Sequence, residues 1–222
     1  MRLQTYDVAD DTMPSAADWV QSYPARFILA AGSRRSVRVM ASPPAALPAG
    51  EYWSRLIVAT RSVANAPTAD DESEQDGSIA VPGRSDVRIG LSLEIRSVLA
   101  LFFRNGPVHT GVRMSEAALE VDGDSVAARV TLVRAGNAAF VGTLKATLRD
   151  AAGTIRSTAI LPLGVYYSLR PRLTLPCPPL PPGEYRLSLE LTSTRPDVAN
   201  SMLLPIAPVR LEQQVTVPSP SP

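Results

Sequence analysis

The chain has 222 residues, of which 45% are apolar and 19% charged, and this globular composition allows one or two domains with hydrophobic cores. The formal net charge of +1 gives no electrostatic case for nucleic acid or an anionic membrane as a partner. The single cysteine excludes both an internal disulfide and a cysteine-rich zinc site.

Two further features of the sequence bear on class and location. The 21 prolines lie between apolar runs rather than inside them, which is typical of short strands joined by stiff turns. No apolar run reaches the roughly 18 residues of a membrane span. No signal peptide is visible at the N-terminus, so the chain taken literally stays in the cytoplasm.

Strand patterns begin early in the chain. Residues 34–40 alternate basic with apolar side chains, and residues 52–59 are rich in aromatic and branched side chains. Shorter patterns precede them at 2–8 and, entered through a proline, at 23–29. An acidic run follows at 70–76, which can hold a metal or a basic partner but is more often a solvated flexible loop, and the loop is favoured.

The strongest pattern is a long strand over residues 86–98 that continues through apolar residues to Arg104. Its alternating apolar members are Val87, Ile89, Leu91, Leu93 and Ile95. A period of two places them on one face of a strand, whereas a helix would scatter them around its circumference. A turn signal at residues 105–107 (Asn-Gly-Pro) follows, so this strand ends one half of the protein.

The second half of the sequence is a regular series of strand patterns. Seven strands are expected, at 113–122, 125–134, 140–149, 154–163, 172–175, 185–191 and 209–217. Short strands with turns about every ten residues are typical of an antiparallel sandwich. The tail at 218–222 (PSPSP) is expected to be disordered.

An internal repeat indicates two similar domains. Residues 47–52 (LPAGEY) recur as residues 180–185 (LPPGEY), an offset of 184 − 51 = 133 residues, and each copy opens a strand. A tyrosine at the start of a penultimate strand resembles the tyrosine corner of immunoglobulin-like sandwiches. The predicted fold is therefore all-β, with two immunoglobulin-like sandwich domains at 1–104 and 105–217.

The repeat also indicates that the first domain lacks its opening strands. In the second half, 183 − 106 = 77 residues separate the hinge glycine from the repeat glycine, whereas 49 residues precede Gly50. The shortfall of 28 residues equals about two strands and a turn. An incomplete sandwich exposes backbone edges and apolar faces, so either the chain starts too late or something else fills the gap.

These residues together resemble the periplasmic chaperones of the chaperone–usher pilus pathway. The strand that runs into residues 101–104 (LFFR) is similar to that family's last first-domain strand, and residues 47–56, 134–137 and 195–197 also fit. The resemblance implies two immunoglobulin-like domains set in an L. It further implies donor-strand complementation, in which the strand with Val87, Ile89, Leu91, Leu93 and Ile95 fills the groove of an incomplete pilin subunit. The alternative is that this face packs into its own sandwich core.

The resemblance extends to some site residues and breaks at others. Glu51, Arg104 and Asp197 match an interdomain ion-pair network that would fix the angle between the domains, the alternative being three exposed charges of little energetic weight. The family's two basic anchors for the subunit carboxylate are missing: one lies in an opening strand absent here, and Ala100 stands at the position of the other. Arg96 is the nearby candidate to replace them.

Catalysis finds little support in the sequence. His109 is the only histidine and has no nucleophile elbow beside it, and Cys177 has no cationic neighbour in sequence to lower its pKa. No phosphate loop, dinucleotide fingerprint or metal-binding histidine pair is present, so no cofactor is expected. The aromatic residues Trp19, Tyr23, Phe27 and Trp53 could form a carbohydrate platform, but in a sandwich they are expected to be buried.

The sequence thus favours a non-enzymatic, chaperone-like protein. Its implied partners are a pilin-like subunit and an outer-membrane usher, and its implied location is the periplasm. A start upstream of Met1 would supply both the missing strands and a signal peptide. The alternatives are a structural or adhesive immunoglobulin-like module without chaperone activity and an esterase that uses His109.

Overall fold

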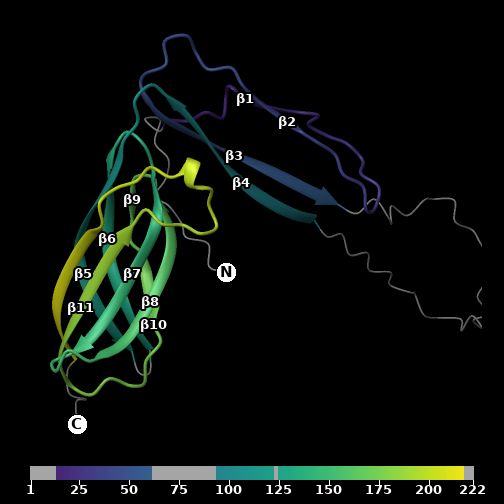
Figure 1. The fold of residues 1–222 in the computed structure, drawn as a ribbon. Helices are drawn as coiled ribbons and strands as arrows, with labels where there is room; N and C mark the ends of the chain where they lie inside the picture. The colour runs from purple at the N-terminus through teal and green to yellow at the C-terminus, as the bar shows by residue number, and fades with distance from the viewer. Residues whose placement is uncertain (1–13, 62–93, 123–124, 218–222) are drawn as a thin grey trace, which may run out of the picture.

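The computed structural model describes residues 14–61, 94–122 and 125–217 and consists almost entirely of β-strands. Figure 1 shows a two-layered sandwich, formed by the second half of the chain, and an arm of two strand pairs that projects from one end of it. The prediction of an all-β fold is confirmed.

The arm consists of two separate antiparallel pairs. Strands β1 (Val20–Tyr23) and β2 (Arg38–Ala41) form one pair, and β3 (Gly50–Arg61) and β4 (Glu94–Asn105) form the other. The strand predicted at 23–29 is wrong, since β1 ends at Tyr23 and Pro24 has no N–H to extend a ladder. The strand predicted at 2–8, the acidic run and the start of the 86–104 strand lie outside the described residues.

The sandwich contains eight strands in two antiparallel sheets. They are β5 (Thr110–Asp122), β6 (Ser125–Gly136), β7 (Phe140–Asp150), β8 (Ile155–Val165), β9 (Ser168–Leu169), β10 (Arg172–Leu175), β11 (Gly183–Thr192) and β12 (Val209–Val217). One sheet has the order β10-β6-β5 with β9 beside β6, and the other has the order β12-β11-β7-β8. All seven strands expected from the sequence are present, and only the two-residue strand β9 was not predicted.

The period of two along the sandwich strands accounts for the core. In β6 the buried residues include Val126, Val130 and Leu132, and in β11 they include Leu187 and Leu189. Each such side chain contributes about 1.5–3 kcal/mol when it leaves water. The core cluster lies entirely within residues 112–217, so the second half of the chain has a hydrophobic core of its own.

The sequence repeat corresponds to a repeated local structure. The hydroxyl of Tyr52, near the start of β3, donates to the carbonyl of Pro48 at 3.0 Å, and the hydroxyl of Tyr185, near the start of β11, donates to the carbonyl of Pro181 at 2.8 Å. Both are bonds to a carbonyl four residues upstream, as in a tyrosine corner. Strand β3 is therefore the counterpart of β11, and β4, which pairs with β3, is the counterpart of β12.

The two halves differ in what surrounds these counterparts. Strand β11 has β12 on one edge and β7 on the other, whereas among the described strands only β4 pairs with β3. On the second edge of β3, the described contacts are the isolated parallel bridge between Ser15 and Trp53 and the bond from the Glu51 N–H to the Asn137 carbonyl. Among the described residues, the arm therefore has fewer strands than the sandwich, and the shortfall inferred from the repeat stays a prediction.

Candidate functional site

The β3–β4 pair presents two different edges, and the backbone register defines both. The Trp53 N–H donates to the Pro14 carbonyl at 2.9 Å and the Trp53 carbonyl accepts from the Ala16 N–H at 2.8 Å, so these groups point away from β4. Trp53 lies opposite Phe102, and this pair is consequently not hydrogen-bonded within the ladder. By alternation, the backbone groups of Arg96, Val98, Ala100 and Phe102 point to the outer edge of β4.

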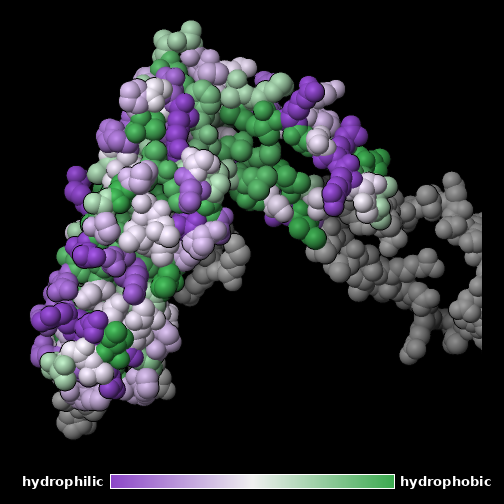
Figure 2. Space-filling view, viewed as in Figure 1, coloured by the Kyte–Doolittle hydropathy of each residue, from purple (hydrophilic) through white to green (hydrophobic). Residues whose placement is uncertain are grey.

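No described strand pairs with this outer edge of β4, and large apolar side chains lie beside it. The exposed fractions are 59% for Ile95, 57% for Val98 and 51% for Leu99, and across the ladder 56% for Ile57. Figure 2 shows hydrophobic surface along the arm, bordered by hydrophilic side chains. An unpaired edge with apolar side chains is a template for adding another strand.

Of the residues predicted to bind a subunit, the structure describes one. Val87, Ile89, Leu91 and Leu93 lie outside the described residues, and Ile95 lies near the start of β4. Ile95 is opposite Thr60, whose hydroxyl donates to the Ile95 carbonyl at 3.3 Å. The alternation of β4 places Ile95 on the same face as Leu99 and Phe103.

This face corresponds to the inward face of the sandwich in the second half. Pairing of β3 with β4 and of β11 with β12 makes Phe103 the counterpart of Val215. Val215 packs against the core of the sandwich. In the arm the same face is covered near the hinge by Trp19, whose ring lies 4.9 Å from that of Phe103 and 5.9 Å from that of Tyr52. Farther along β4, Leu99 and Ile95 remain half exposed or more.

Glu51 anchors the arm to the sandwich. It is 1% exposed, and its carboxylate accepts from Arg104 Nε at 2.8 Å, from the Trp53 indole N–H at 2.8 Å and from the Ala139 backbone N–H at 3.0 Å. Arg104 also donates to the Met202 carbonyl. A buried carboxylate is stable only when bonded in this way. Two of the three predicted network residues, Glu51 and Arg104, are therefore in contact.

The third predicted network residue, Asp197, has a different partner. Its carboxylate accepts two bonds from Arg195, at 2.7 and 2.6 Å, in a bidentate pair two residues apart in sequence. The hydrogen bond from Arg195 lowers the pKa of Asp197 to about 2. Arg104 makes no bond to Asp197, so the predicted three-residue network is wrong in this member. A local bidentate partner competes successfully because it needs no particular angle between the two halves.

An aromatic cluster lies beside the Glu51 network. The Trp53 ring meets those of Tyr166 and Tyr167 edge-on, at 5.0 and 5.3 Å, and Phe102 stacks with Tyr166 at 6.1 Å. The guanidinium of Arg134 lies over the rings of Trp53 and Tyr167, at 5.5 and 5.2 Å. Aromatic pairs and cation–π contacts of this kind add to the stability of the junction.

Sequence reasoning missed most of this cluster. Tyr166 and Tyr167 are adjacent residues in a turn between two strands, and nothing in the sequence pattern there indicates a long-range contact. Trp19 and Trp53 were expected to be buried and are half-buried. Tyr23 and Phe27 were expected to be buried and are 70% and 41% exposed, because no described element covers them.

Two asparagines organise the hinge. The side-chain amide of Asn137 donates to the carbonyls of Ala49 and Pro107, at 3.3 and 3.1 Å. The backbone carbonyl of Asn137 accepts from the Glu51 N–H at 3.0 Å. Asn105 donates to the Leu47 carbonyl at 2.6 Å. The bonds of Asn137 join the two halves next to Glu51, and the bond of Asn105 links the end of β4 to the segment before β3 at the base of the arm. The sequence signal was the Asn-Gly turn for Asn105 and the resemblance at 134–137 for Asn137.

Arg96, the candidate to replace the missing basic residues that would bind a subunit carboxylate, already has an ion-pair partner. Arg96 forms a short ion pair with Glu94 on the same strand, and Ala100 has no charged group to offer. Both lie on the exposed part of β4. The arrangement at these positions does not form a basic pair.

The two residues considered for catalysis have the following surroundings. The backbone N–H of His109 donates to the Asn137 side chain at 2.9 Å, and the backbone carbonyl of His109 accepts from the Asn137 and Ala138 N–H groups. Burial raises the pKa of the Cys177 thiol, which reduces its thiolate fraction at neutral pH. Among residues 14–61, 94–122 and 125–217, no group of three His, Cys, Asp or Glu side chains could hold a metal ion.

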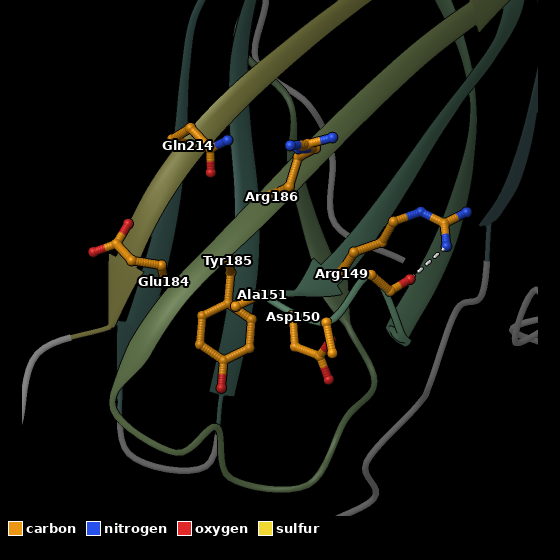
Figure 3. A pocket seen from close by; sticks show the side chains of 9 residues that line it. Arg149, Asp150, Ala151, Glu184, Tyr185, Arg186 and Gln214 are labelled. Carbon is orange, nitrogen blue, oxygen red and sulfur yellow. Dashed lines mark hydrogen bonds between the residues drawn. The ribbon is translucent and has the colours of Figure 1, made fainter.

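A cavity of about 410 Å³ lies at the end of the sandwich away from the arm (Figure 1), and Figure 3 shows the side chains that line it. Its walls are Arg149, Asp150, Ala151, Ala152, Gly153, Glu184, Tyr185, Arg186 and Gln214. Arg149 donates to the Gly153 carbonyl, Glu184 accepts from Thr216, and the Tyr185 hydroxyl is bonded to Pro181. The charged side chains of the lining balance, and most of its polar groups are satisfied within the protein.

The comparisons with known proteins leave the function to be argued from this geometry. No helix in the described ranges combines the length and apolar character needed to cross a membrane. No protein-family model, no curated protein and no solved structure matched the chain.

Proposed function

We propose that this chain is a periplasmic chaperone-like protein that holds pilin or fimbrial subunits by β-strand addition during pilus assembly. The observation that carries the proposal is the outer edge of β4, where the backbone groups of Arg96, Val98 and Ala100 point outward and no described strand pairs with them. Main-chain bonds to such an edge supply affinity, and the neighbouring side chains supply specificity.

The base of the arm supports this use. Glu51 and Arg104 bond β3 and β4 to each other and to the sandwich, so the hinge end of the binding strand has a fixed position. The apolar side chains of Ile95, Val98 and Leu99 lie farther out and are exposed. Binding of this kind needs neither a cofactor nor a catalytic group, and a second partner would be an outer-membrane usher that receives the subunit.

A structural or adhesive module is the second candidate. The observation in its favour is the position of Ile95 on the face that is inward in the second half of the chain, where an apolar residue serves packing. The absence of a basic pair at Arg96 and Ala100 also favours it, because the usual capture of the subunit carboxylate would need one.

Replacing Val98 with proline tests the proposal. This change removes an N–H that points to the outer edge of β4 and leaves the ladder with β3 intact. We expect the tagged chain from the periplasmic fraction of its own host to co-purify with an immunoglobulin-like subunit that lacks a strand, and the V98P variant to recover at least tenfold less of it. Leu56→Pro, which removes a ladder N–H, is the control for loss of the arm itself.

Two results would contradict the proposal. A wild-type chain that is a monodisperse monomer in the cytoplasm, with no such subunit bound, would favour the structural module. Esterase activity that disappears in His109→Ala would contradict both candidates.

A further inference from the structure

The repeat allows the outward faces of the two halves to be compared residue by residue. In the sandwich this face of β11 and β12 is polar: Glu190 lies opposite Arg210, whose Nε donates to the Glu190 carboxylate at 2.8 Å. The repeat aligns β3 with β11 and β4 with β12, so the corresponding opposite pair in the arm is Ile57 and Val98. An ion pair in one copy is therefore an apolar pair in the other.

The rest of the outward face of β4 shows the same replacement of polar by apolar residues. Ala100 and Phe102 lie on this face. The corresponding residues of β12 are Glu212 and Gln214. Near the hinge, Phe102 stacks with Tyr166 of the sandwich, and this end of the face is partly covered. Farther out, Ala100, Val98 and Ile57 are exposed, and no described element packs over them.

The inward face of β4 is apolar as well. Ile95 and Leu99 lie on it, beyond the part that Trp19 covers, and both are more than half exposed. A strand with one face in water alternates polar with apolar residues, whereas a strand buried on both faces is a nearly continuous apolar run. Residues 98–103 (VLALFF) are such a run, and β12 contains none. Strand β4 therefore has the composition of a strand with both faces covered.

We propose that the segment added at the outer edge of β4 is itself a continuous run of valine, isoleucine or leucine, which covers β4 on both faces. Its side chains lie beside Val98 and Ala100 on the outward face and beside Ile95 and Leu99 on the inward face. Val98 and Ala100 supply both the outward backbone groups and the exposed side chains, so this apolar surface is continuous with the binding edge. The inference rests on the proposed function and specifies the class of segment that the edge accepts.

Two segments fused to a soluble carrier protein test this choice. One is a run of eight apolar residues, and the other alternates the same apolar residues with serine; the carrier alone is the blank. We expect the full chain to bind the continuous run at least tenfold more tightly, since an alternating segment covers only one face of β4 in any register. Amide hydrogen exchange at Val98 and Ala100 should slow with either segment, because these N–H groups acquire acceptors.

The sandwich supplies the matched variant. The double substitution Ile57→Glu with Val98→Arg gives the arm the ion pair that Glu190 and Arg210 form at the corresponding positions, and it keeps every backbone N–H. We expect this variant to bind the continuous run at least tenfold more weakly, and the alternating segment with less than a twofold change. The control, Ile57→Val with Val98→Ile, keeps both side chains apolar and should keep the preference. The comparison of the two segments on the wild-type chain decides the question even if the charged variant fails to fold.

Three results would overturn the inference. Equal affinity of the wild-type chain for the two segments would show that the outward face takes no part, and the β4 edge would stand by itself if Val98→Pro abolished both affinities. Absence of binding to either segment would remove this inference together with the proposed function. A concentration-dependent dimer that is lost in the charged double variant would assign the apolar outward face to a second copy of the chain.

Discussion

A carboxylate that is almost fully buried needs a hydrogen bond for each of its oxygens, and Glu51 receives three. The contact between Glu51 and Arg104 was expected only from the family resemblance, and the register of β3 and β4, which brings positions 51 and 104 opposite each other, accounts for it. The indole of Trp53 and the N–H of Ala139 were not predicted as its donors. Asp197 was assigned to the same network, and the nearer Arg195 binds it instead.

Glu51→Ala should destabilise the protein strongly. The change leaves the N–H groups of Trp53 and Ala139 without acceptors and Arg104 without its carboxylate, and loss of one member of a buried pair costs about 3–5 kcal/mol. Asp197→Ala is the matched control, since that carboxylate is 60% exposed and its removal should produce no measurable change. Urea unfolding followed by tryptophan fluorescence measures both, and equal losses would contradict the role assigned to Glu51.

At the scale of elements, strands with a clear period of two were predicted well. The sandwich strands alternate a buried face with an exposed one, so periodicity locates them within a few residues. Two predictions were less successful: β1 stops at Tyr23, before the apolar residues 27–29, and the two-residue β9 is too short to show a pattern. The open edges of β3 and β4 could be anticipated only as a shortfall in length, because an edge depends on which strands are neighbours and not on the strand's own sequence.

The two tyrosine corners should make similar bonds with unequal effects on stability. Tyr185→Phe removes the bond to Pro181 next to the core, and we expect a loss of about 1 kcal/mol in the free energy of unfolding. Tyr52→Phe removes the equivalent bond to Pro48 at a more exposed site and should cost less. Thermal unfolding of the two variants compares them, and a larger effect at Tyr52 would contradict the assignment of the core to the second half.

At the scale of the whole molecule, the sandwich and the arm differ in how much apolar surface they bury. The core cluster belongs to the sandwich, whereas the arm carries the exposed apolar side chains and the open edges (Figures 1 and 2). Elements with few buried contacts open most easily, and binding surfaces are often drawn from them. The sequence predicted an incomplete first domain from the repeat, but it contained no sign of the aromatic cluster that fastens the arm.

The fragment 105–217 should fold without the arm. Every member of the core cluster lies inside it, and the strand order of both sheets is complete. We expect a cooperative unfolding transition and retention of the β-sheet circular dichroism signal. Removal of the arm exposes Tyr166 and Tyr167, so a modest decrease in stability relative to the full chain is expected. A fragment with no cooperative transition would show that the arm is required for folding.

The most direct test of the central claim, that the outer edge of β4 holds a partner strand, is site-specific photo-cross-linking in the native cell. A photoreactive amino acid replaces Val98, which is exposed on β4, and in a matched chain it replaces Lys145, which is exposed on the sandwich. We predict a cross-link from position 98 to an immunoglobulin-like subunit that lacks a strand, and none from position 145. Equal labelling at the two positions, or no cross-linked partner at position 98, would contradict the claim.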